Sequence, residues 1–171
     1  MRRRRFLRVV MISVLAYITV SFLGAWQLVH PPRWTRVHPS DREFVVQSED
    51  GISLSGTWKD ATVTPVAVVM HFHGIGDVRN LHHAEWLARA GFHSIAIDFR
   101  AHGQSGGDRT SFGWHERQDV RALTREARRR WPSLPIFAWG ASLGAAAIIY
   151  GADETRDLAG VILESPYATI D

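Results

Sequence analysis

The chain has 171 residues, of which 22% are charged and 46% hydrophobic, a composition typical of a folded domain rather than a disordered chain. Its pI of about 9.9 would suit a nucleic-acid binder, but the excess of positive charge lies at the start of the chain, in Arg2–Arg5 and Arg8. Residues 31–171 carry 15 basic and 17 acidic side chains, which argues against nucleic acid as a partner, and the absence of cysteine excludes disulfides and thiolate chemistry.

The first predicted element is a membrane helix. After Arg8 come 21 residues without a formal charge, Val9–Val29, and at ~1.5 Å per residue such a helix is about 30 Å long, enough to cross a bilayer. The arginines before it fit the excess of positive charge found on the cytoplasmic side of membranes. We therefore expect residues 1–30 to form a cytoplasmic arginine cluster and a transmembrane signal anchor, with the rest of the chain outside the cytoplasm.

Two alternatives for this leader stay open. A cleaved signal peptide prefers small residues one and three positions before the cut, and a cut after Ala25 would have Leu23 at the third position. Residues 3–8 also resemble the core of a twin-arginine export signal. Either alternative makes the protein secreted or exported. In all three cases residues 31–42, with Pro31, Pro32 and Pro39, are expected to form a stiff linker.

Residues 43–171 are predicted to form an α/β domain that begins with a hairpin around Asp50-Gly51. Strands and helices then alternate along the chain. A helix capped by Asn80 is expected to end at Gly91. The expected strands are Glu43–Ser48, Ile52–Trp58, Val66–Phe72, Phe92–Asp98, Pro135–Trp139 and Gly160–Glu164; the later helices carry the apolar stripe Val120, Leu123, Ala127, Trp131 and the segment Ala145–Tyr150. This order predicts an open, mostly parallel sheet with helices on both faces.

The sharpest chemical motif is Gly140-Ala141-Ser142-Leu143-Gly144, between a predicted strand and a predicted helix. It matches Gly-x-Ser-x-Gly in the context that this motif requires. A serine on such a sharp turn has a strained backbone, and small neighbours let strand and helix approach each other. The turn lifts the hydroxyl clear of the sheet and directs the helix N-terminus at developing negative charge. Ser142 is therefore the candidate nucleophile.

With two further segments, this motif makes residues 43–171 resemble the α/β-hydrolase superfamily, in its serine-aminopeptidase and monoglyceride-lipase-like branch. One segment is His71-Phe72-His73-Gly74-Ile75 after the buried strand. The other is Asp98–Ser105, which resembles the family's Asp-x-Arg-Gly-His-Gly-x-Ser loop with Ala101 in place of the usual glycine. The resemblance implies that the backbone amides of Ile75 and Leu143 form the oxyanion hole, where the loss of one donor costs about 3–4 kcal/mol.

In this family the acid and the histidine of the triad follow the nucleophile along the chain. Only 29 residues follow Ser142, and none is histidine. The resemblance therefore implies a C-terminally incomplete fold, in a fragment or a truncated product, and 43–171 is expected to be a partial domain. His73 and His102 are expected to support loops rather than to act as the base. Glu164 and Asp171 follow the last strand, where a few relatives carry their acid.

Several histidines also raise the possibility of a metal site. His71, His73, His82 and His83 form two short clusters, but the zinc pattern His-x-His-x-Asp-His would need aspartate and histidine where Ile75 and Gly76 stand. We therefore expect no metal and no other cofactor.

Two hypotheses of different class follow. The first is a serine hydrolase that cleaves an ester, thioester or amide of a small-molecule or lipid-like substrate through an acyl-enzyme at Ser142. The second is a non-catalytic interaction or scaffold domain on the same fold. The membrane is the one partner that the sequence indicates, through residues 9–29; it points to no protein partner.

Overall fold

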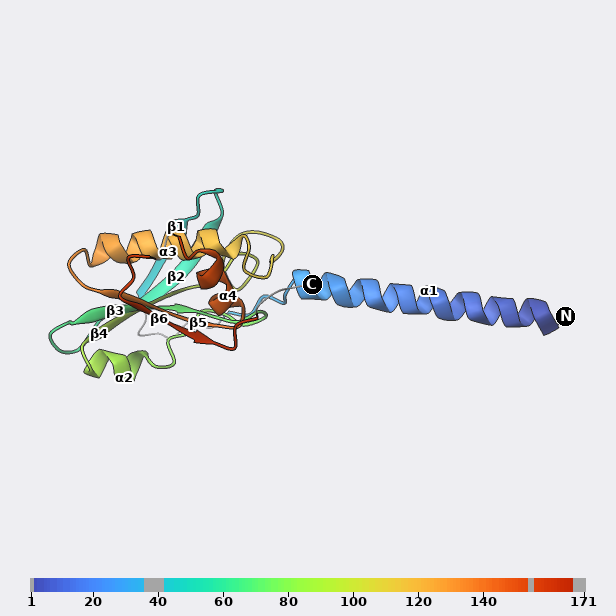
Figure 1. Ribbon diagram of the computed structural model, residues 1–171, viewed down its shortest axis with the longest axis horizontal. Coiled ribbons are helices and arrows are strands. Elements are labelled where there is room, and N and C mark those ends of the chain that lie inside the picture. Colours follow the sequence, from blue (N-terminus) through green and yellow to red (C-terminus); the bar gives the residue numbers. More distant parts are fainter. Residues whose placement is uncertain (1, 36–41, 154–155, 168–171) are drawn as a thin grey trace. The chain divides into compact units, whose positions relative to one another are not determined.

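The computed structural model describes residues 2–35, 42–153 and 156–167, in two compact units, one ending at His30 and the other beginning at Pro31. The first unit is the helix α1, Arg2–Val29 (Figure 1). By length and composition it can cross a membrane, since an 18-residue stretch within it has a mean hydropathy of 2.1. Apolar side chains lie on every side of this helix rather than along one stripe. Most of the predicted linker, residues 36–41, lies outside the described residues.

The second unit is built on one six-stranded sheet. Its order is β1-β2-β4-β3-β5-β6; β2 pairs antiparallel with β1 and β4, and the remaining pairs are parallel. The strands are β1 Arg42–Gln47, β2 Ser53–Lys59, β3 Ala67–Phe72, β4 Phe92–Ile97, β5 Ile136–Ala141 and β6 Gly160–Glu164. The central strands β3 and β4 are almost wholly buried. The apolar run Ala67–Met70 predicts this for β3, whereas β4 also buries His93 and Ser94.

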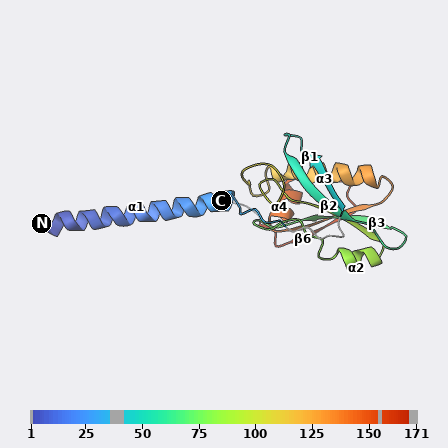
Figure 2. The ribbon, with the colours of Figure 1, turned by 180° about the vertical axis from the view of Figure 1, so that it is seen from behind.

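Helices cover both faces of this sheet. The helices α3, Glu116–Arg130, and α4, Leu143–Tyr150, lie on one face, and α2, Ala84–Arg89, lies on the other (Figure 1, and from behind in Figure 2). The core lies mainly between β3, β4 and α3, where Met70, Ile95 and Leu123 are fully buried. The predicted open, mostly parallel α/β sheet with helices on both faces is thereby confirmed.

The helix predicted from Asn80 is shorter than expected. It begins at Ala84, and Asn80 does not cap it; the Asn80 side chain accepts a 2.9 Å hydrogen bond from the amide of His82. Such a local bond closes a turn around the asparagine, which competes with the helix for the same backbone. Residues 80–83 therefore form a connection that brings His83 beside the sheet.

The parallel register determines where the loops gather. His71 of β3 lies opposite Ala96 of β4 and Trp139 of β5. The carboxyl ends of these three strands therefore meet at one edge of the sheet, and the segments that follow them, including Ser142, project from that edge. In open α/β sheets this edge is where ligands bind.

Candidate active site

Ser142 is the single residue that connects β5, which ends at Ala141, to α4, which begins at Leu143. Its backbone has φ 49° and ψ −108°, in a region that L-residues rarely adopt. Such a conformation costs roughly 1–3 kcal/mol and persists only where the surroundings enforce it. The turn expected from the Gly-x-Ser-x-Gly motif is thus present, and its strain is located at the serine.

The two glycines of the motif permit this turn for steric reasons. A Cβ atom on Gly144 would lie 2.4 Å from the carbonyl oxygen of Phe72, at the end of β3. A Cβ atom on Gly140 would lie 2.6 Å from the carbonyl carbon of Gly144. Because both clashes are with backbone, no side-chain adjustment relieves them. The glycines therefore let α4 press against β5 and β3, which directs its N-terminus to the edge of the sheet.

Hydrogen bonds hold the backbone of the turn on both sides. The Ser142 amide donates to the carbonyl oxygen of Glu164 at 2.8 Å, and the Ser142 carbonyl accepts from the Ala146 amide at 3.0 Å. Leu143 is the first residue of α4, so its N–H is among the helix amides that have no partner within the helix. The predicted oxyanion donor Leu143 thus lies at the helix N-terminus, directly after the candidate nucleophile.

The segment after β3 lies against the same turn. A Cβ atom on Gly74 would lie 3.7 Å from the Cβ atom of Ser142. Ile75 and Gly76 follow in a turn closed by the Asp77 amide, which donates to the Gly74 carbonyl at 3.3 Å. We call residues 74–77 the Gly74 loop. The structure therefore brings together the three residues singled out from the sequence, Ser142, Leu143 and Ile75, within two adjoining turns.

Two buried histidines hold the Gly74 loop by hydrogen bonds to its backbone. His73 Nε2 accepts from the Phe99 amide at 3.0 Å, and its Nδ1 lies 2.7 Å from the Gly74 carbonyl. His102 Nε2 accepts from the Gly76 amide at 3.2 Å, and its Nδ1 lies 2.8 Å from the Arg100 carbonyl. A ring that accepts at Nε2 and faces a carbonyl at Nδ1 is neutral, with its proton on Nδ1. Both imidazoles thus use both nitrogens to hold backbone.

Burial keeps these two rings neutral. Burial, and to a smaller extent the neighbouring His102, lowers the pKa of His73 to about 4; burial also lowers the pKa of His102. The rings pack edge to face with centroids 5.0 Å apart. Their engagement with four backbone groups agrees with the expectation that they support loops.

Residues 98–107, which we call the Asp98 loop, follow β4 and contact the Gly74 loop through His102. Asp98 accepts from the Arg79 amide at 2.7 Å, from the Arg79 guanidinium, and from the Gln104 amide at 2.9 Å. Ala101, in place of the family's glycine, has φ 61°, so this position favours glycine and the alanine is strained. Arg79 was not among the residues predicted from the sequence, although its place after the Gly74 loop puts it at the edge of the sheet where Asp98 also emerges.

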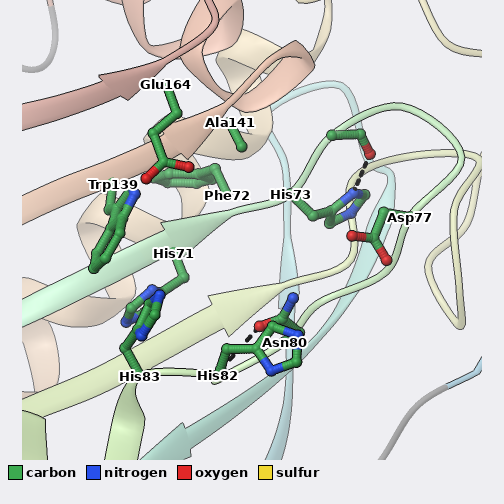
Figure 3. Close-up of a pocket in the computed structure, with 11 residues that line it drawn as sticks. His71, Phe72, His73, Asp77, Asn80, His82, His83, Trp139, Ala141 and Glu164 are labelled. Carbon is green, nitrogen blue, oxygen red and sulfur yellow. Dashed lines mark hydrogen bonds between the residues drawn. The ribbon is translucent and has the colours of Figure 1, made fainter. Parts of the chain in front are cut away.

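A cavity of about 160 Å3 lies beside the turn, on the face that carries α2 (Figure 3). His83 stacks on Trp139 with centroids 4.8 Å apart, His71 lies next to both, and Glu164 stands at the rim. Burial lowers the pKa of His71 to about 4. Asp171, the other candidate acid, lies outside the described residues.

The histidine clusters do not combine into a metal site in the part of the chain that the structure describes. No three His, Asp or Glu side chains there converge as ligands. His73 is turned toward Phe99, away from His71 and His83, and its Nε2 is already bonded. Among the described residues, the histidines of the cavity therefore do not form a coordination shell.

Comparison with known proteins relates the chain to hydrolases. The family model described as "Serine aminopeptidase, S33" matches residues 63–171. Human monoglyceride lipase is 34% identical over 132 residues, which cover 74% of this chain and 43% of the lipase. The monoacylglycerol lipase of Mycolicibacterium smegmatis is 32% identical over 111 residues, which cover 60% of this chain and 38% of that protein. The chain thus spans less than half the length of these relatives.

Two solved esterase structures have a fold similar to that of this chain. The Pyrococcus furiosus esterase Pf2001 is 30% identical, with a TM-score of 0.70 over 81% of this chain and 58% of the esterase. A thermostable carboxyl esterase from Bacillus coagulans is 26% identical, with a TM-score of 0.63 over 74% of this chain and 44% of that enzyme.

Proposed function

Because the chain belongs to the serine aminopeptidase S33 family of α/β-hydrolases, in its monoglyceride-lipase-like branch, we propose that it is part of a serine hydrolase with Ser142 as the nucleophile. The bond cleaved is an ester, thioester or amide. The observation that carries the proposal is the strained backbone of Ser142 at the start of α4, beside Gly74. Strain of this kind is retained where function requires it.

The proposed reaction proceeds through an acyl-enzyme. Ser142 Oγ attacks the substrate carbonyl, and the hydroxyl proton passes to a general base as the tetrahedral oxyanion forms. The amides of Ile75 and Leu143 donate to that oxyanion. The leaving group departs with a proton, and water then attacks the acyl-enzyme to release the acid and regenerate the hydroxyl.

A lipid-like ester is the proposed substrate class. Two of the relatives are a monoglyceride lipase and a monoacylglycerol lipase. The long apolar helix α1 supports the same proposal, since it would keep the domain at a bilayer where such substrates reside. We propose that α1 is a retained anchor, with the arginines at the N-terminus in the cytoplasm and the domain outside.

A fluorophosphonate probe tests the proposal, because it reacts covalently with an activated serine. The full-length protein, in native membranes, is expected to be labelled, and peptide mapping is expected to find the adduct on Ser142. Heat-denatured protein serves as the control. An intact, folded protein that stays unlabelled would instead support the interaction or scaffold domain.

A further inference from the structure

The segment that follows α1 contacts the loops beneath the candidate site. The Arg33 guanidinium donates one hydrogen bond to the carbonyl oxygen of Ser105 and a second to that of Gly107. Both acceptors belong to the Asp98 loop. An exposed arginine of a linker normally points into solvent, because holding the side chain in place costs conformational entropy. Here the planar guanidinium spans two backbone carbonyls at once, a geometry that lysine does not reproduce.

The same stretch of the Asp98 loop is held on its other side by β2. The Gly106 amide donates to the Ser53 carbonyl at 2.7 Å, and the Ser55 amide donates to Ser105 Oγ at 2.9 Å. Ser105 Oγ in turn donates to the Asp98 carbonyl at 2.6 Å. The loop is therefore clamped between a strand of the sheet and the Arg33 side chain.

The two residues after Arg33 reach the Gly74 loop itself. Trp34 and Thr35 line a cavity of about 320 Å3 together with Gly76, Asp77 and Val78. Residues 33–35, which we call the strap, thus adjoin both loops that shape the candidate site.

A hydrogen bond between the two loops completes the connection. His102, in the middle of the Asp98 loop, accepts from the Gly76 amide at 3.2 Å. Gly76 directly follows Ile75, the proposed oxyanion donor. The position of the Ile75 amide therefore depends on the Asp98 loop through His102, and on Arg33 through that loop.

We propose that Arg33 is a positioning residue for the oxyanion hole, so that the strap after the membrane helix sets the geometry of the site. This rests on the proposed function for its effect on catalysis, but the mechanical coupling stands on the contacts alone. Arg33 acts on the reaction through the two loops, without touching the substrate. The hydrolase domain would then be fully competent only with its anchor-side segment in place.

The test compares Arg33→Ala and Arg33→Lys with Arg109→Ala in the full-length protein. Arg109 is a suitable control because it is an exposed arginine close to the Asp98 loop, and among the described residues its ion pair with Asp108 is 3.8 Å long. Hydrogen exchange by mass spectrometry, in detergent or nanodiscs, is expected to be faster in Arg33→Ala at residues 74–78 and 98–107. With a p-nitrophenyl ester, kcat is expected to fall about tenfold to a hundredfold with KM within about twofold. Arg33→Lys is expected to lie in between, and Arg109→Ala to match the parent.

Each outcome decides the proposal. Unchanged exchange in both loops in Arg33→Ala would overturn the coupling, and a rise in KM with kcat unchanged would make Arg33 a substrate contact instead. Faster exchange with unchanged kcat would overturn the positioning role. A parent protein that fluorophosphonate does not label would refute the proposed hydrolase, and the exchange data would then still decide whether Arg33 holds the two loops.

Discussion

The backbone amide of Ser142 donates a 2.8 Å hydrogen bond to the carbonyl oxygen of Glu164, which ties the turn to the end of β6. The bond involves no side-chain atom of either residue. The strained turn is therefore held by backbone, and the Ser142 hydroxyl is not needed to form it.

Ser142→Ala in the full-length protein is accordingly expected to remove hydrolysis while the fold persists. Loss of a covalent nucleophile commonly lowers kcat by several orders of magnitude. Ester hydrolysis and circular dichroism measure the two effects. Activity within about tenfold of the parent would reject Ser142 as the nucleophile.

Gly144→Ala and Gly74→Ala are expected to separate stability from activity. The new Cβ atom at Gly144 would clash with the Phe72 carbonyl at 2.4 Å, so we expect a loss of about 3 kcal/mol or more in the free energy of unfolding. At Gly74 the Cβ atom would be in ordinary contact, 3.7 Å from Ser142 Cβ, so stability is expected to hold while kcat falls. Urea unfolding and ester assays distinguish the pair. Equal stability of the two variants would contradict the packing described here.

Stability is expected to fall between about pH 6.5 and pH 4. Burial lowers the pKa values of His71 and His73 to about 4 in the folded protein, from an ordinary value of 6.5. In this window the unfolded chain binds protons that the folded chain does not, so acidification favours unfolding, by up to about 1.4 kcal/mol per pH unit for each histidine.

The measurement for this prediction is the urea midpoint at several pH values. His71→Gln is expected to reduce the slope with pH, because it removes one of the titrating groups. His115→Gln is the control, since it removes an exposed histidine on the other face of the sheet. A midpoint that is flat across the window would show that these histidines are accessible to protons in the folded state.

The membrane orientation is tested by protease added to intact cells. Because the arginines before Val9 favour the cytoplasmic side, the domain is expected to be digested without lysis. Replacement of Arg2–Arg5 and Arg8 by glutamine is expected to weaken this orientation. Protection of the domain until the cells are lysed would exclude the proposed topology.

A piece consisting of residues 31–171 is expected to self-associate. In the described part of the chain, β6 pairs only with β5, and Val161 and Ile162 are 48% and 50% exposed. An apolar strand with an unpaired edge invites pairing with another copy. Ile162→Lys is expected to reduce association measured by sedimentation, more than Val45→Lys on the opposite edge strand β1. A monomeric parent piece would contradict this expectation.

The elements of the domain were predictable from the sequence because each has a strong local pattern. The predicted strand Gly160–Glu164 matches β6. The apolar stripe Val120, Leu123, Ala127 identifies α3, although Trp131, the last residue of the predicted stripe, lies just past its end. The family assignment, which rested on three short motifs, is confirmed. The predicted start of α2 was wrong. An asparagine whose side chain closes a turn and an asparagine that caps a helix have the same local sequence, and Asn80 does the former.

What the sequence could not predict is the set of long-range contacts that hold the site. Arg79 pairs with Asp98, and Arg33 reaches Ser105 across more than seventy residues of chain. Polar residues in loops carry no periodic pattern, so their partners emerge only from the folded backbone. The strain at Ala101 was visible in the sequence only as a departure from the family's glycine.

The strand order also has a consequence for how the chain assembles as it is synthesised. The hairpin β1–β2 pairs with β4, whereas β3, made between them, lies on the far side of β4. During synthesis from the N-terminus, the hairpin therefore lacks its partner strand until β4 appears, and the Arg33 guanidinium lacks the carbonyls of Ser105 and Gly107 until the Asp98 loop follows. The hairpin must therefore wait for β4 and the Asp98 loop before it is secured, which leaves it exposed to chaperones and proteases while β3, α2 and β4 are made.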